Sequence, residues 1–150
     1  MRIRKIKITN FKCFKDTFEL PLNEGLNIIV GNNESGKSTI LEAVHLALSG
    51  LYNGKYLKNE LSEFLFNNKT IDEFKKDPKN PPEILIEVFF EGENLAIYEG
   101  DDNSERKKNC GILLKIALDE KDRELYNDYI KSCQNSNSIS LPIEYYEATW

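Results

Sequence analysis

The sequence predicts an α/β fold with a mixed sheet, and three features support it. Residues 26–30 form a short apolar run typical of a buried strand, a glycine-containing loop follows at 31–39, and apolar periodicity at 40–48 predicts a helix. Residues 84–90 and 111–118 are further apolar runs with no helical pattern between them. Consecutive strands without an intervening helix indicate antiparallel pairing beside the strand that leads into the loop.

Composition excludes several classes of protein. The chain has 150 residues, 30% of them charged and 40% hydrophobic, with a net charge of −5, so it is not a basic nucleic-acid-binding domain as a whole. No apolar run is long enough for a membrane span, and the first residues lack a signal-peptide hydrophobic region. Cys13, Cys110 and Cys133 are widely spaced and unpatterned, which favours reduced thiols in a cytoplasmic protein.

The loop fits the pattern GxxxxGK[ST] of a phosphate-binding loop in every fixed position. Backbone N–H groups and the dipole of the following helix would hold the phosphates, and Lys37 would bridge the β- and γ-phosphates. The Ser38 hydroxyl is the expected Mg²⁺ ligand, and ATP is the expected nucleotide. The residues expected to bind the nucleotide are Gly31, Asn32, Asn33, Glu34, Ser35, Gly36, Lys37, Ser38 and Thr39. The alternative is a turn that caps a helix and binds nothing, which the flanking strand and helix patterns disfavour.

The other elements follow from the same rules of periodicity and turn composition. Gly50 is expected to end the helix that follows the loop. Further strands are expected at 3–8, 18–20, 95–98 and 143–150, a short helix within 51–66, a helix at 120–132, and loops at 67–82 and 135–138.

Six basic residues precede the first acidic residue, Asp16. They are Arg2, Arg4, Lys5, Lys7, Lys12 and Lys15. The favoured interpretation is a solvated strand face and loop, and the alternative is a surface for phosphates of a nucleotide or nucleic acid. Lys12, which follows Phe11, is also a candidate to approach the nucleotide. Since side chains alternate along a strand, several of these cations are expected to point apart, and we expect no duplex binding.

A phosphate-loop ATPase also needs an acidic strand end to hold Mg²⁺ and activate water. Asp119 and Glu120 end an apolar run, but Lys115 interrupts it, as in a half-exposed antiparallel strand. An ordinary turn is therefore favoured over a catalytic pair, and no catalytic residue is assigned.

Residues 6–14 and 26–43 together resemble the amino-terminal lobe of ABC-type ATPases of the structural-maintenance-of-chromosomes (SMC) and RecF kind. The form Asn-Asn-Glu-Ser-Gly-Lys-Ser at 32–38 is most similar to the OLD family, ATP-dependent endonucleases that often act in bacterial antiphage defence. The resemblance is tight over 1–50 and loose thereafter. It implies a P-loop NTPase lobe whose mixed sheet combines the phosphate-loop strand with antiparallel strands.

The resemblance also implies what else the complete protein contains. In the OLD family the ABC signature, the acidic Mg²⁺ strand and the Toprim nuclease domain lie beyond the region that corresponds to 1–150. Gln134 is a weak candidate for the Q-loop glutamine. The implied partners are further copies of the ATPase in a homodimer or higher oligomer, and DNA bound through a carboxy-terminal region, with no membrane. The lobe alone is expected to bind ATP without efficient hydrolysis. A RecF-type recombination or repair ATPase and a self-contained small kinase or nucleotide-binding module are the alternatives.

Overall fold

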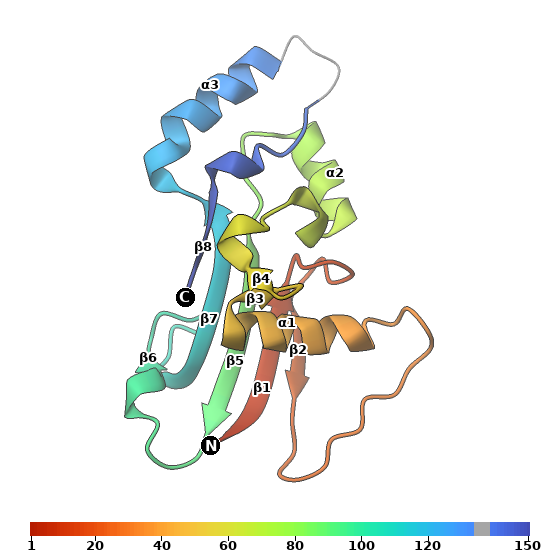
Figure 1. Cartoon of the computed structure of the whole chain (residues 1–150), viewed down its shortest axis with the longest axis vertical. Coiled ribbons are helices and arrows are strands. Elements are labelled where there is room, and N and C mark those ends of the chain that lie inside the picture. The colour runs from red at the N-terminus through yellow and green to blue at the C-terminus, as the bar shows by residue number, and fades with distance from the viewer. Residues whose placement is uncertain (134–138) are drawn as a thin grey trace.

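The computed structural model describes residues 1–133 and 139–150, and its centre is an antiparallel sheet (Figure 1). Along the sheet lie β2 (Phe18–Pro21), β1 (Arg2–Thr9), β5 (Ile84–Glu91) and β7 (Asn109–Leu118). Two short strands, β6 (Glu99–Gly100) and β8 (Tyr146–Thr149), also pair with β7, at residues 109–110 and 115–118 respectively. A separate hairpin joins β3 (Leu51–Tyr52) to β4 (Lys55–Tyr56). Every strand pairing in the described part of the chain is antiparallel.

The helices occupy one face and one end of this sheet. α1 (Lys37–Ser49) crosses one face, whereas α2 (Asn68–Lys76) and α3 (Arg123–Cys133) lie beyond the end at which β7 finishes (Figure 1). Short 3-10 turns span Leu57–Asn59, Glu63–Leu65, Ala96–Tyr98, Glu120–Asp122 and Ile143–Tyr145. α1 ends where predicted, because Gly50 adopts a left-handed φ of 67° and its N–H donates to the Leu46 carbonyl at 2.9 Å.

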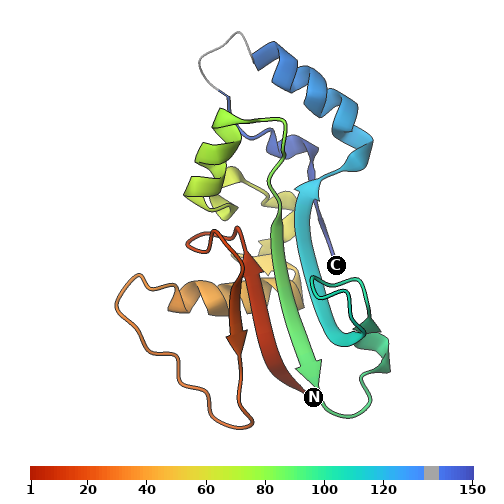
Figure 2. The ribbon, with the colours of Figure 1, turned by 180° about the vertical axis from the view of Figure 1, so that it is seen from behind.

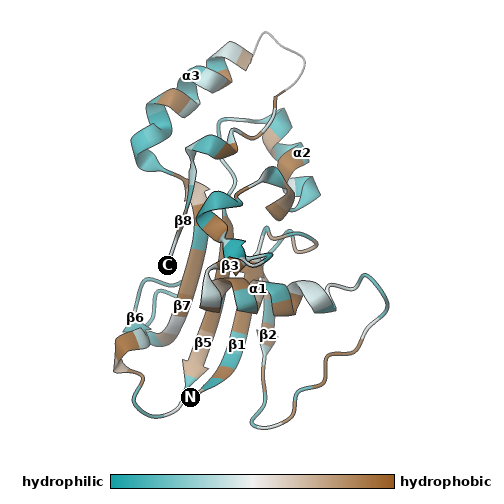
Figure 3. Ribbon diagram, viewed as in Figure 1, coloured by the Kyte–Doolittle hydropathy of each residue, from teal (hydrophilic) through white to brown (hydrophobic). Residues whose placement is uncertain are grey.

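Strand alternation places the core between the sheet and α1. Ile6 and Ile8 of β1 are buried with the alternate apolar residues of β5 and β7, and with Ile40, Ala43, Leu46 and Ala47 of α1. Figure 3 shows this apolar band along the strands. Among the helices of residues 1–133 and 139–150, none crosses the opposite face (Figure 2). There Lys7, Glu87 and Phe89 are nevertheless buried, and the loop at 101–108 contacts Lys7 and Glu87.

The α/β fold class is confirmed, as are the strands predicted at 3–8, 18–20, 84–90 and 111–118 and the helices at 40–48 and 120–132. The final strand is shorter than predicted, since it begins at Tyr146 after a 3-10 turn. The loop predicted at 135–138 lies outside the described residues.

Three element predictions are wrong for local reasons. Within 51–66, a turn at Asn53-Gly54 is predicted by the composition and is present between β3 and β4, but the short helix expected after it is replaced by two separate 3-10 turns, at Leu57–Asn59 and Glu63–Leu65. The segment predicted as a loop at 67–82 contains α2, whose Asn67 cap accepts from the Lys69 N–H at 3.0 Å. Residues 95–98 form a 3-10 turn, not a strand.

The strand predicted at 26–30 is also absent, since these residues have no regular structure and belong to a long extended segment beside the sheet (Figure 1). Leu26 is 85% exposed and Val30 is 83% exposed. An apolar run forms a buried strand only when a neighbouring strand satisfies its backbone. β2 is the last strand on this side of the sheet and pairs with β1 alone, and none of the described strands pairs with residues 26–30.

Candidate nucleotide-binding site

The amino-terminal end of α1 has backbone N–H groups without a side-chain cap, a feature that suits an anion. Gly36 is the N-cap residue, with a left-handed φ of 88°, and α1 has neither a side-chain cap nor an acidic residue in its first turn. The first N–H groups of any α-helix lack partners within the helix and carry its positive dipole end. Here no side chain satisfies them, so they are available to phosphate oxygens.

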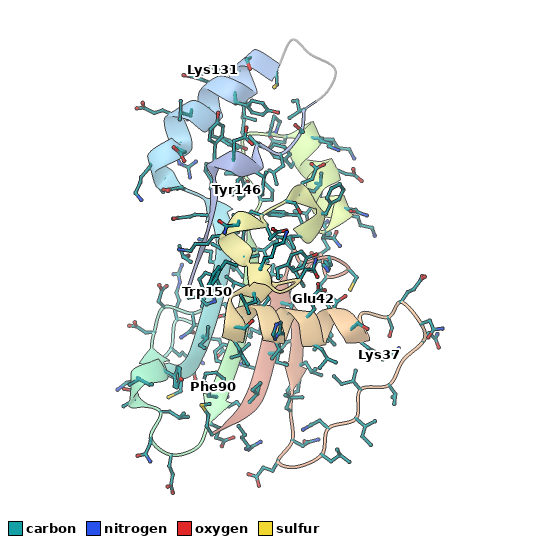
Figure 4. All side chains as sticks on the ribbon, viewed as in Figure 1. Lys37, Glu42, Phe90, Lys131, Tyr146 and Trp150 are labelled. Atoms are coloured by element: carbon teal, nitrogen blue, oxygen red, sulfur yellow. The ribbon has the colours of Figure 1, made fainter. Side chains whose placement is uncertain are left out.

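The loop before α1 is closed upon itself. The Ser35 N–H donates to the Asn32 carbonyl at 3.2 Å, and a Cβ on Gly31 would lie 2.6 Å from the Ser35 hydroxyl. Lys37 folds back over the loop and donates to the carbonyls of Gly31 and Asn32, both at 2.6 Å. Its ammonium therefore lies over the loop, beside the amino-terminal end of α1 (Figure 4).

The structure brings the nine predicted residues together in this single loop and first helical turn. Ser38 is exposed, so its hydroxyl is accessible as a Mg²⁺ ligand. No cluster of three or more histidine, cysteine or acidic side chains that could hold a metal occurs among residues 1–133 and 139–150. Within the described residues, the Ser38 hydroxyl is the side-chain ligand that would hold Mg²⁺ beside phosphate oxygens.

A tight turn at 10–14 forms the wall behind the loop. A Cβ on Gly36 would lie 2.9 Å from both the Cys13 sulfur and the Phe14 ring. The Phe14 N–H donates to the Phe11 carbonyl at 2.9 Å, and its ring stacks on Phe18 with the centroids 4.5 Å apart. Glycine at position 36 is thus required twice, once by its backbone conformation and once by this close contact.

Lys12, a candidate to approach the nucleotide, instead contacts α1. Its ammonium lies 2.5 and 2.6 Å from the two carboxylate oxygens of Glu42 and 5.2 Å from the centre of the Tyr52 ring. Partial burial opposes the charge, but the hydrogen bond and charge of Glu42 outweigh it, so the pKa of Lys12 is raised. Sequence analysis missed this role of Glu42, because the pair is 30 residues apart in the chain.

Asp119 and Glu120 do not join this site. The Asp119 side chain accepts from the Lys121 N–H at 2.9 Å, as the cap of a 3-10 turn. Glu120 accepts from the Arg123 guanidinium at 2.6 Å, and this hydrogen bond lowers the pKa of its carboxyl. Figures 1 and 2 both place the end of β7 away from the start of α1. The favoured interpretation of an ordinary turn agrees with these contacts, and Gln134 lies outside the described residues.

The six basic residues near the amino terminus are all engaged within the chain. Five of them pair with carboxylates: Arg2 with Glu24 and Glu91, Lys5 and Lys7 with Glu19 and Glu105, Lys12 with Glu42, and Lys15 with Glu73. Arg4 donates to the Asn109 side chain at 2.8 Å. Lys5 and Lys7 lie two residues apart on one face of β1, as strand alternation predicts, and they converge on Glu105 and on the Phe89 ring.

An α/β domain whose first helix follows a loop with the pattern GxxxxGK[ST] is the arrangement expected of the P-loop class. Comparison with known families narrows this class, since residues 5–146 match the AAA_23 family, described as an AAA domain. Because the match covers nearly the whole chain, the protein belongs to this family.

Curated relatives place the chain beside DNA-associated ATPases. It is 28% identical over 130 residues to a structural maintenance of chromosomes protein 3 homolog of Plasmodium falciparum, covering 79% of this chain and 10% of that protein. It is 23% identical over 128 residues to the DNA replication and repair protein RecF of Clostridium tetani, covering 85% and 35%. It is 46% identical over 46 residues to the DNA double-strand break repair Rad50 ATPase of Methanopyrus kandleri, covering 31% and 5%.

The chain therefore spans about a third of the RecF relative and a tenth or less of the other two. No helix in the described residues has the length and apolarity needed to cross a membrane.

Proposed function

We propose that this chain is the ATP-binding amino-terminal lobe of an SMC-, RecF- or Rad50-type ATPase, with residues 31–39 as the phosphate site. The observation that carries the proposal is the uncapped start of α1 beneath the Lys37 ammonium. Free amides, a positive helix end and a positioned cation are together the requirements for binding adjacent phosphates. Similarity to proteins named as ATPases supports ATP, with Mg²⁺, as the ligand.

Isothermal titration of Mg-ATP into the wild type and Lys37→Ala tests this proposal. We expect weak binding by the wild type and at least tenfold weaker binding by the variant, since Lys37 is the charged side chain lying over the loop. Lys58→Ala is a matched control, because Lys58 is an exposed lysine in the 3-10 turn at 57–59. Equal affinity of wild type and Lys37→Ala for ATP contradicts the assignment.

We propose further that the lobe alone hydrolyses ATP at no more than a trace rate. Asp119 and Glu120, the carboxylates considered for positioning an attacking water, are engaged in their own turn. Electrostatic stabilisation without a placed nucleophile leaves much of the rate enhancement absent. Steady turnover that disappears in Glu120→Gln would instead support the self-contained kinase or nucleotide-binding module.

The complete site would then require groups from outside this lobe. The exposed apolar run at 26–30 supports this, because an apolar segment of this kind is normally covered. We propose that the complete ATPase assembles as a homodimer or higher oligomer that brings two lobes together. This assembly would cover the run at 26–30 and supply the acidic Mg²⁺ residues. DNA contact by that assembly is a proposal from the relatives named for DNA repair.

A finer proposal concerns the OLD family. The form of residues 32–38 supports an ATP-dependent endonuclease in antiphage defence, whereas the SMC, RecF and Rad50 relatives support chromosome or repair functions. The reading frame that follows the codon for Trp150 separates these proposals. A Toprim-like Glu and Asp-x-Asp pattern there supports the endonuclease, whereas a long coiled coil or an ATPase domain alone supports the relatives' class.

A further inference from the structure

The turn at 10–14 is held in an unusual backbone conformation beside the phosphate loop. Asn10 and Lys12 have positive φ angles of 58° and 47°, which residues with a Cβ adopt only when surrounding contacts enforce them. Lys12 also carries the side chain that reaches α1. The conformation of this turn therefore decides where the ammonium of Lys12 lies.

Partly buried hydrogen bonds hold the turn in place. The Lys12 N–H donates to the Leu65 carbonyl at 2.9 Å, and the buried Asn67 side chain donates to the Lys12 carbonyl at 2.6 Å. Asn10 accepts from the Thr70 hydroxyl at 2.9 Å and donates to the Glu83 carbonyl at 2.9 Å. The turn is thus anchored to the start of α2 and to the residue before β5.

We infer that the Lys12–Glu42 ion pair is a positioning device for the phosphate loop, an inference that rests on the proposed ATP site. Glu42 lies on α1, just beyond its first turn (Figure 4). Its ion pair with Lys12 joins that helix to the turn at 10–14. The same turn presses Cys13 and Phe14 against Gly36. The pair therefore sets the position of the first amides of α1 relative to the wall of the site.

The location and environment of the pair favour this role over a simple surface contact. The side chains of Lys12 and Glu42 are 28% and 30% exposed, and the ammonium lies 5.6 and 5.2 Å from the centres of the Phe11 and Tyr52 rings. Such partly buried charges are more rigidly held than exposed pairs, whose coupling is usually weak. The chain offers a more exposed counterpart, since Lys15 pairs with Glu73 of α2 and the two side chains are 32% and 59% exposed.

The test measures Mg-ATP affinity in Glu42→Gln, Lys12→Met and their double variant, with Glu73→Gln as the matched control. We expect each single variant to bind ATP about fivefold more weakly, and the double variant to bind no more weakly than either, because both remove one interaction. Glu73→Gln should bind like the wild type. The charge-exchanged variant Lys12→Glu with Glu42→Lys should recover most of the lost affinity, which a general loss of folding would not permit.

Two outcomes overturn the inference. A loss of affinity in Lys12→Met without one in Glu42→Gln would mean that Lys12 contacts the nucleotide directly. Unchanged affinity in both variants would mean that the pair does not position the loop. Thermal unfolding of Glu42→Gln and Glu73→Gln is expected to give similar midpoints. A loss of ATP affinity in Glu42→Gln alone would then reflect the position of the phosphate loop and not a lower stability of the folded protein. Failure of the proposed ATP site itself is distinguishable, because Lys37→Ala would then also leave binding unchanged.

Discussion

The Glu105 carboxylate lies 2.9 Å from the Lys7 ammonium, across the face of the sheet that no helix covers. It also pairs with Lys5 and accepts from the Asn109 side chain at 3.1 Å. One residue earlier, the Ser104 N–H donates to the buried Glu87 carboxylate at 2.7 Å. The loop at 101–108 is therefore fastened to the sheet by charge pairs, where a helix would ordinarily supply apolar contacts.

In Glu105→Gln, the free energy of unfolding is expected to depend less on pH under acidic conditions than in the wild type. Hydrogen bonds from Lys5 and Lys7 lower the pKa of Glu105 from 4.5 to about 2. A carboxyl with a lowered pKa in the folded state stabilises the protein above its unfolded pKa, and this contribution disappears as pH falls toward the folded pKa. The free energy of unfolding of the wild type should therefore be about 1 kcal/mol larger than that of the variant at neutral pH, as for a favourable ion pair.

Denaturant unfolding of both proteins between neutral pH and about pH 2 measures this difference. The difference should shrink from about pH 5 downward. A difference that stays constant over that range would contradict the role of the Glu105 charge.

Gly111→Ala is expected to destabilise the pairing of β5 with β7. A Cβ at Gly111 would lie 2.7 Å from the Val88 carbonyl oxygen, which is backbone and cannot easily move. The expected loss is on the order of 1–3 kcal/mol, as for other overpacked sites. Gly100→Ala, where no atom lies within 4 Å of the new Cβ, is the matched control for thermal unfolding. Equal midpoints in the two variants would show that the strands can adjust.

The chain alone is expected not to bind duplex DNA at physiological salt. The net charge is −5, and five of the six basic residues near the amino terminus already pair with carboxylates. Binding would require those pairs to break. The logarithm of the binding constant would also fall with the logarithm of salt concentration, with a slope of about −0.9 per phosphate contact. A mobility shift that persists at physiological salt, and is lost when Arg2, Arg4, Lys5 and Lys7 become glutamate, would contradict this expectation.

Local sequence patterns predicted the parts of this fold that depend on local chemistry. The loop at 31–39 could be recognised because its glycines, Lys37 and the following helix occur in a fixed order. β5 and β7 could be recognised because both are long apolar runs. In each case the residues within a few positions of one another carry enough information to define the element.

The missed features depend on partners far away in the chain. The run at 26–30 has the composition of a strand, but no described strand pairs with it, and the local sequence does not show this. α2 was missed because polar residues surround Ile71 and Phe74, whose burial depends on the tertiary fold. The Lys12–Glu42 pair joins two ordinary charged positions, and neither has a local pattern that indicates the other.

Amide chemical shifts of isotope-labelled protein, recorded as Mg-ATP is added, test the central claim most directly, since they show which residues the nucleotide reaches. We predict that the largest changes fall on residues 31–40, where the loop meets the start of α1, and that Lys37→Ala removes them. Large changes elsewhere, such as at Asp119 and Glu120, with residues 31–40 unaffected, would contradict the assignment of the phosphate site.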